Sequence, residues 1–149
     1  MKRRVALLLI TALVISLAAF QVSAEQEENV IYLDDGSYIL ISVSSVNERA
    51  TSTKNGSKSY KYYTSDGNLA WEAVLYGTFT YTGTTATCTS SSCSVTISNT
   101  VWYVVSKGTS KSGASALGEV TMGRKVLGVT VDKETVSMSL TCDANGNLS

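Results

Sequence analysis

The chain of 149 residues contains no histidine and no proline, and only three cysteines. Histidine is the usual general base of a catalytic triad and a common ligand of zinc, so its absence excludes an ordinary triad or zinc site. Basic and acidic side chains number 12 each, which leaves no excess of positive charge. We therefore expect no nucleic-acid partner, because such partners attract basic patches.

Paired carboxylates are the remaining simple route to hydrolysis, since two Asp or Glu side chains can cleave a glycoside. Glu72 and Glu119 are the candidates, but both fall on the more polar rows of their expected strands, where solvated side chains belong. The run from Asp143 to Asn147 is similar in composition to a calcium loop, yet its glycine is misplaced and the bidentate glutamate is missing. We expect no enzymatic activity, no metal and no cofactor.

The long apolar run of this sequence lies at its N-terminus. Lys2, Arg3 and Arg4 precede apolar residues from Val5 to about Phe20, and Val22-Ser23-Ala24 follows. This order is typical of a secretory signal peptide cleaved after Ala24. A membrane anchor is the alternative, but the run is short of the roughly 20 residues that a span needs.

Cleavage would leave residues 25–149 as one secreted, extracellular domain. Removal of three of the 12 basic side chains leaves 9 against 12 acidic ones, a weakly acidic balance. No second long apolar run follows, so we expect no membrane partner after cleavage.

Strict alternation of side chains predicts β-structure. Every second residue from Leu69 to Tyr81 is uncharged and mostly apolar, while the intervening residues are mixed. Successive side chains of a strand point to opposite faces, so this pattern predicts a long strand with one buried side. The stretch from Glu134 to Cys142 alternates in the same way.

No segment after residue 24 shows a helical period, and turn signals recur every 8 to 12 residues or so. Asp34-Asp35-Gly36 predicts a first hairpin, and Lys54-Asn55-Gly56-Ser57 predicts a second hairpin at an exposed edge. Gly123-Arg124 predicts a strand break, and Asp132-Lys133 a turn. The expected fold is an all-β, antiparallel two-sheet β-sandwich of about nine to eleven strands, with a β-barrel as the alternative.

Three cysteines in an exported chain allow one disulfide and leave one thiol. Cys88 and Cys93 flank a Ser/Thr run that we expect to be a hairpin loop, which they could close. Cys88 and Cys142 would instead join a middle strand to the last one, and loop-closure entropy favours this longer link by about 4 kcal/mol. We favour the pair Cys88–Cys142, with Cys93 a buried thiol beside Val95 and Ile97.

Aromatic side chains are the best functional lead. Tyr60 and Tyr62 lie close together, Tyr76 falls on the more polar row of its strand, and Trp102 and Tyr103 face opposite ways. Exposed rings bind sugars or protein surfaces, whereas cross-strand packing is the alternative use. The hypothesis is that Tyr60, Tyr62, Tyr76 and either Trp102 or Tyr103 form one exposed binding patch.

Three parts of the chain carry a resemblance: Leu75–Tyr81 with Ala86–Ser90, then Ser110–Gly113, and finally Leu140–Cys142 with Gly146 and Leu148-Ser149. In these stretches the chain resembles a group of small secreted proteins of Gram-positive bacteria. The resemblance covers most of the chain after residue 24 and implies shared strand, turn and cysteine positions, but no particular activity. The resemblance supports the pair Cys88–Cys142, and Cys93 is the cysteine that departs from the pattern of that group.

Together these observations predict a secreted, disulfide-bonded binding or structural module whose partner is an extracellular polymer or protein. The alternative is a secreted effector, such as a bacteriocin-like factor or an inhibitor of extracellular enzymes. A binding module would only retain its partner, whereas an effector would change the growth of neighbouring cells or inhibit a hydrolase.

Overall fold

The computed structural model describes residues 28–46 and 52–149. The predicted signal peptide at residues 1–24 therefore lies outside the described residues, as do the first residues of the predicted domain. None of the described residues belongs to a helix that is long and apolar enough to cross a membrane. The strands are β1 (Glu28–Tyr32), β2 (Tyr38–Val46), β3 (Thr53–Tyr63), β4 (Leu69–Tyr81), β5 (Ala86–Ile97), β6 (Trp102–Ser112), β7 (Ser115–Val126) and β8 (Val129–Thr141).

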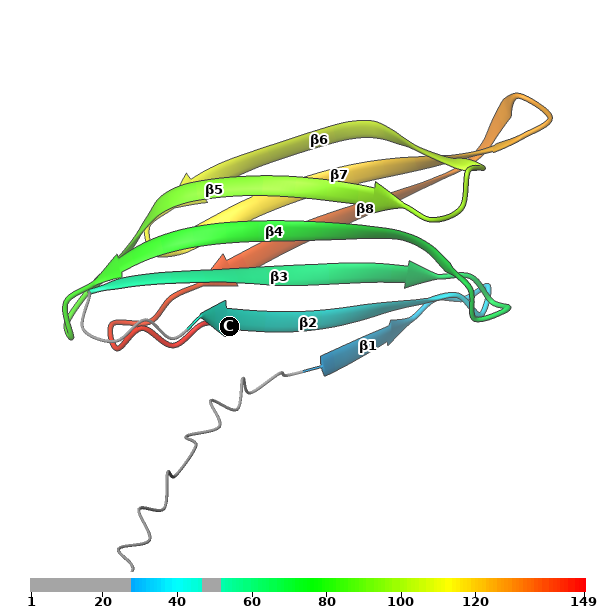
Figure 1. Cartoon of the computed structure of the whole chain (residues 1–149). Coiled ribbons are helices and arrows are strands. Elements are labelled where there is room, and N and C mark those ends of the chain that lie inside the picture. The colour runs from blue at the N-terminus through cyan, green and yellow to red at the C-terminus, as the bar shows by residue number, and fades with distance from the viewer. Residues whose placement is uncertain (1–27, 47–51) are drawn as a thin grey trace, which may run out of the picture.

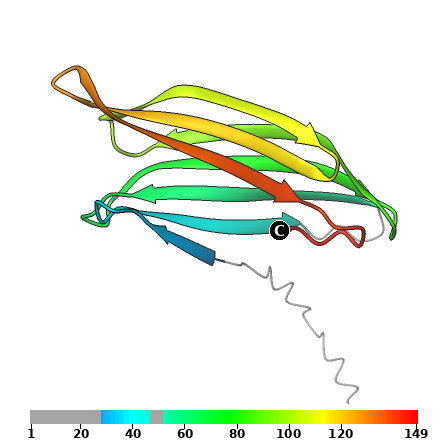
Figure 2. The same cartoon turned by 180° about the vertical axis from the view of Figure 1, so that it is seen from behind.

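Two antiparallel sheets divide these strands in chain order. Strands β1 to β5 form a five-stranded sheet and β6 to β8 a three-stranded sheet. Figures 1 and 2 show the sheets stacked as two layers, with β7 packed on β4 and β5, and β8 on β3 and β4. The sheets do not close into a barrel. The predicted β-sandwich is confirmed, with eight strands in the described residues that are fewer and longer than expected.

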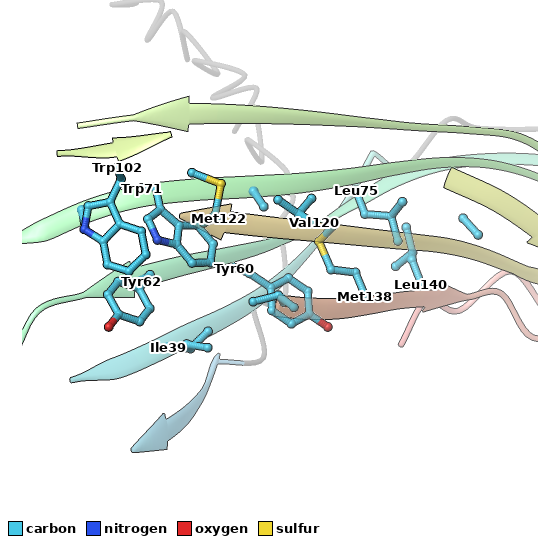
Figure 3. Packing of buried hydrophobic residues seen from close by; sticks show 14 of the residues in the cluster. Ile39, Tyr60, Tyr62, Trp71, Leu75, Trp102, Val120, Met122, Met138 and Leu140 are labelled. Carbon is cyan, nitrogen blue, oxygen red and sulfur yellow. The ribbon is translucent and has the colours of Figure 1, made fainter. Parts of the chain in front are cut away.

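Strand β4 is the centre of the core, as its alternation predicts. Trp71, Ala73, Leu75 and Phe79 are fully buried on one side of it. Burial of a side chain such as Leu75 or Phe79 stabilises the sandwich by about 1.5–3 kcal/mol. The opposite layer covers them with alternate residues of β7 and β8, several of which Figure 3 shows: Ala116, Val120, Met122, Val136, Met138 and Leu140.

Three aromatic rings join the layers at one end of this core (Figure 3). Tyr62 stacks on Trp71 with ring centroids 5.2 Å apart and planes 7° from parallel. Trp102, from the other sheet, lies 5.1 Å from Tyr62 and 6.3 Å from Trp71. Contacts between tilted aromatic rings add to the free energy of burial, so this cluster holds the start of β6 against the five-stranded sheet.

The predicted hairpin at Asn55-Gly56 is wrong, because both residues lie inside β3. The Thr78 hydroxyl donates a hydrogen bond of 2.9 Å to Asn55 Oδ1. A Cβ on Gly56 would lie 2.1 Å from Cδ1 of Leu148. Gly56 therefore makes room for the C-terminal segment and does not form a turn.

The predicted break at Gly123-Arg124 and the predicted turn at Asp132-Lys133 are also wrong. Strand β7 continues to Val126, and the turn that follows is Leu127-Gly128, with φ angles of 51° and 81°. Gly123 lies under an aromatic ring: a Cβ there would be 2.6 Å from Cζ of Tyr103. Because Gly123 has no side chain, the Tyr103 ring can lie directly against its backbone.

Candidate binding face

The predicted aromatic patch does not form, because three of its rings belong to the core. Tyr60, Tyr62 and Trp102 are only 7%, 4% and 4% exposed, whereas Tyr76 is 45% exposed. Tyr60 and Tyr62 pair with residues of the buried row of β4, so the pleat turns their side chains inward. Burial is the main cause that raises the pKa of both phenols.

Tyr103 is separated from Tyr76 by the sandwich itself. Tyr103 covers Gly123 on the outward side of the three-stranded sheet, and its hydroxyl lies 2.7 Å from the Thr130 hydroxyl. The Lys125 ammonium sits 4.4 Å above the ring, a cation–π contact. Tyr76 faces outward from the other sheet, so the two rings share no surface.

Three other tyrosines form a ladder on the outward side of the five-stranded sheet, which we call the outward face. Tyr32 is in register with Tyr38, and Tyr38 with Tyr63. Ring centroids are 6.0 Å apart in the first pair and 4.8 Å in the second, whose planes are stacked at 9°. Tyr32, at the sheet edge, is 77% exposed.

Sequence reasoning missed this ladder, although part of its signal was available. The predicted hairpin at Asp34-Asp35-Gly36 is confirmed, and Leu33 N–H donates to the Ser37 carbonyl at 2.8 Å. That turn alone sets Tyr32 opposite Tyr38. Tyr63 faces outward because it follows inward-facing Tyr62 in the same strand, and its pairing with Tyr38 joins strands that no local pattern brings together.

Short neutral polar side chains cover most of the rest of the outward face, and Val30, Leu40 and Val74 are the apolar residues among them. The hydroxyls of Ser42 and Ser59 lie 3.0 Å apart. The ion pair of Lys61 and Glu72, with 4.0 Å between Nζ and Oε1, adds no net charge, and Glu28 adds one negative charge at the edge. The neutral positions are Ser42, Ser44, Asn55, Ser57, Ser59, Thr78, Ser90, Ser92, Ser94 and Thr96.

Tyr76 borders a shallow depression of about 330 Å³ in this face. Its neighbours across the strands are the hydroxyls of Ser57 and Ser92. The depression therefore combines one exposed ring with hydroxyl and amide groups that can donate and accept hydrogen bonds. Its lining residues are Ser44, Asn55, Gly56, Ser57, Tyr76, Gly77 and Thr78.

The two carboxylates considered for hydrolysis lie on opposite sides of the molecule. Glu72 pairs with Lys61 on the outward face. Glu119 is exposed on the outward side of the three-stranded sheet, beside a hollow of about 490 Å³ that also contains Leu117 and Ser137. Because the core lies between them, they cannot act on one bond as a pair.

The structure describes three free thiols, and their positions narrow the possible pairings. Cys88 and Cys93 lie in one continuous strand, β5, so the expected loop between them is wrong. A strand rises about 3.3 Å per residue, which separates their Cα atoms far beyond the roughly 7 Å limit of a disulfide. The pairing Cys88–Cys93 is therefore excluded.

Cys88 and Cys142 are both buried beside the turn between β6 and β7. Cys88 N–H donates to the Gly113 carbonyl at 2.8 Å, and Cys142 N–H donates to the Ala114 carbonyl at 3.0 Å. Burial is the main cause that raises the pKa of both thiols. Cys93 is half-buried against the core. The bond between Cys88 and Cys142 stays a prediction.

Comparisons with protein-family models, with curated proteins and with solved structures find no match to this chain. Function is therefore inferred from the surface chemistry of the chain itself. On the outward face, aromatic and hydrogen-bonding side chains gather in a regular pattern.

Proposed function

We propose that this protein is a secreted, non-catalytic binding module that holds a neutral polysaccharide on its outward face. The observation that carries the proposal is the tyrosine ladder beside rows of hydroxyl groups on one exposed side of the sheet. An extracellular role agrees with the signal peptide expected at residues 1–24.

Sugar rings combine apolar C–H faces with dense hydroxyl groups, and the outward face offers a partner for each. The exposed rings of Tyr32 and Tyr76 supply apolar area, and a tyrosine side chain has few rotatable bonds to order on binding. Serine, threonine and asparagine both donate and accept hydrogen bonds, as sugar hydroxyls do. With little net charge on this face, a neutral polymer fits better than a charged one.

Rigidity of the sheet supports the same conclusion. The residues of the outward face are held by strand pairing on both sides of β2, β3 and β4. Groups that are already ordered lose less conformational entropy when a polymer binds. The spacing of about 4.8 Å between strands then repeats similar contacts along an extended chain.

Retention of purified residues 25–149 on insoluble cell-wall polysaccharide, chitin, cellulose and mucin tests the proposal. Tyr76→Ala should weaken binding to the retained polymer by about tenfold or more, because it removes the exposed ring that borders the depression. Tyr103→Ala, on the other sheet, is the matched control and should bind as the wild type does. Far-UV circular dichroism checks that each variant is folded.

Two results would contradict polysaccharide binding. One is that no neutral polymer retains the wild-type protein. The other is that Tyr76→Ala and Tyr103→Ala bind equally well. Inhibition of an extracellular hydrolase by the same protein would instead favour an effector.

A further inference from the structure

The hairpin between β7 and β8 projects beyond the rest of the sandwich and carries an apolar end (Figures 1 and 2). We call residues 124–133 the hairpin tip. Leu127 at its end is 100% exposed, and Val129 and Val131 are 64% and 51% exposed. Every residue of the hairpin tip is exposed, although the Tyr103 ring lies against Lys125 and Thr130 on one side of it.

Leu127 is unfavourable here for two separate reasons. Its φ of 51° is the left-handed conformation, and no other non-glycine residue among the described ones has a positive φ. Two-residue turns of this type favour Asn or Asp followed by Gly, which suit both the backbone and the solvent. A leucine that is disfavoured by conformation and by hydration points to a role outside folding.

Basic side chains flank the apolar end. Arg124, Lys125 and Lys133 lie behind Leu127, and Asp132 is the acidic residue among them, so the hairpin tip carries a net charge of +2. Asp132 is in register with Arg124. Two further carboxylates, Asp35 and Glu134, lie near the base of the hairpin, on the side of the body.

Exposed valines extend the apolar surface towards the start of β6. Lys125 N–H donates to the Val101 carbonyl at 2.8 Å, which places Val101 beside the base of the hairpin. Val101, Val104 and Val105 are all exposed. Exposed valines therefore also lie next to the base of the hairpin.

We propose that the hairpin tip inserts into the interface of an anionic phospholipid membrane and holds the mature protein on that surface. Leu127, Val126 and Val129 would enter the acyl boundary, and Lys125 and Lys133 would meet the phosphates. This departs from the expectation that the mature chain has no membrane partner. It does not depend on polysaccharide binding, since the outward face lies elsewhere.

The composition of the hairpin tip favours lipid over a protein partner. Protein interfaces bury about 800 Å² on each side and depend on Trp, Tyr and Arg anchors. The narrow tip offers little area, its arginine, Arg124, is in register with Asp132, and the ring beside it, Tyr103, is already occupied by Lys125 and Thr130. The acyl boundary of a membrane is a non-directional solvent, so insertion requires neither a large interface nor aromatic anchors.

Co-sedimentation of residues 25–149 with vesicles of equal parts phosphatidylglycerol and phosphatidylcholine, and with pure phosphatidylcholine, tests this. The wild type should bind the anionic vesicles more tightly than the neutral ones, and salt should weaken binding. Leu127→Asn should reduce binding at least tenfold while the protein stays folded, because Asn suits a left-handed turn. Lys125→Gln and Lys133→Gln should each reduce it about fivefold.

Val30→Asn is the matched control, since it removes an exposed aliphatic side chain from β1 and should leave binding unchanged. Absence of binding, or equal binding by Leu127→Asn, would overturn the proposal. So would equal binding to both kinds of vesicle, because the cations would then have no part. If sedimentation velocity shows an oligomer that Leu127→Asn dissociates, the hairpin tip binds a second copy of the chain instead of lipid.

Discussion

Glu134 lies at an inward-facing position of β8, where an acidic side chain is costly. It lies two residues before Val136, on the same side of the strand as the buried row Val136, Met138 and Leu140, and it is in register with buried Met122. Burial is the largest cause that raises the pKa of its carboxyl group above the ordinary value of 4.5, and the charges of Asp132 and Asp35 add to the effect. Glu134 is therefore easier to protonate in the folded chain than in the unfolded chain.

The sign of the resulting pH dependence follows from linkage. The folded state holds this proton more tightly, so the stabilising contribution is full below pH 4.5 and is lost as pH rises through the raised pKa. Glu134→Gln should raise the melting temperature at pH 7 by a few degrees and change it little at pH 4. Thermal unfolding followed by circular dichroism across this range measures the difference.

The pKa values of Asp35 and Asp143 are lowered, so their contributions to stability are lost in acid. This loss occurs in the wild type and in Glu134→Gln alike, so it cancels when their melting temperatures are compared. Glu119→Gln, exposed on the outward side of the same sheet, is the control and should show no such trend. An equal or lower melting temperature for Glu134→Gln at pH 7 would contradict the assignment.

Individual site residues were harder to predict than the strands that carry them. An isolated strand does not reveal which of its sides is buried when both carry aromatic rings, as β3 does with Tyr60, Tyr62 and Tyr63. Pairing with Ala73 and Trp71 of β4 places Tyr60 and Tyr62 on the buried side, and the alternation of the strand then turns Tyr63 outward. The ladder depends on contacts between strands that are distant in sequence.

Among the elements, β4 and the hairpin of β1 and β2 were predictable because local signals agree with the tertiary structure. Alternation coincides with burial at every second position from Trp71 to Phe79, and it fails at Leu69 and Ala70, where the register shifts. A one-sided pattern of this kind requires no knowledge of the partner strands.

Polar strands were mistaken for loops or turns for the opposite reason. The Ser/Thr run from Thr89 to Ser92 lies in the middle of β5, at a sheet edge where hydroxyls face solvent. Gly56 and Gly123 look like turn residues but accommodate Leu148 and Tyr103. Both partners come from other elements, so the need for glycine is invisible locally.

The C-terminal segment after β8 depends on such distant contacts as well. Asp143 Oδ1 accepts hydrogen bonds from the backbone N–H of Asn145 and Asn147 at 2.8 and 2.9 Å, which closes a turn. The side-chain amide of Asn147, which donates to Asp143 Oδ2 at 2.7 Å, is the largest cause that lowers the pKa of Asp143, and the backbone bonds add to it. The turn returns Leu148 to a bridge with Cys142 and places it over β3.

A disulfide between Cys88 and Cys142 would join the start of β5 to this segment. Its formation removes two electrons and two protons from the thiols, which an oxidising disulfide of an extracellular oxidoreductase accepts. We expect a non-reducing peptide map of the secreted protein to show Cys88 joined to Cys142. Cys88→Ser and Cys142→Ser should each lower the free energy of unfolding by about 2–4 kcal/mol.

The double variant should cost no more than either single one, since both remove the same bond. Cys93→Ser is the control and should leave the map unchanged. A map that joins Cys93 to Cys142, or that shows only free thiols after export, would contradict this pairing.

At the scale of the whole molecule, the two sheets depend on one core. Their strands are not paired with one another along β5 and β6, and the layers meet mainly through side chains. The aromatic cluster around Trp71 and Trp102 lies at one end, with Leu75 and Leu140 towards the other (Figure 3). If the core is continuous, a substitution that destabilises the Leu140 end must also destabilise the packing around the tryptophans.

Leu140→Ala tests this continuity, because Leu140 is fully buried on β8 and the tryptophans report from the opposite end. The variant should lose about 2–5 kcal/mol of unfolding free energy. Urea unfolding should remain a single transition, with tryptophan fluorescence and far-UV circular dichroism shifted to the same lower midpoint. Leu117→Ala, on the outward side of β7, should cost much less. A fluorescence midpoint that stays in place while the dichroism midpoint falls would mean that the two ends, and with them the two sheets, unfold separately.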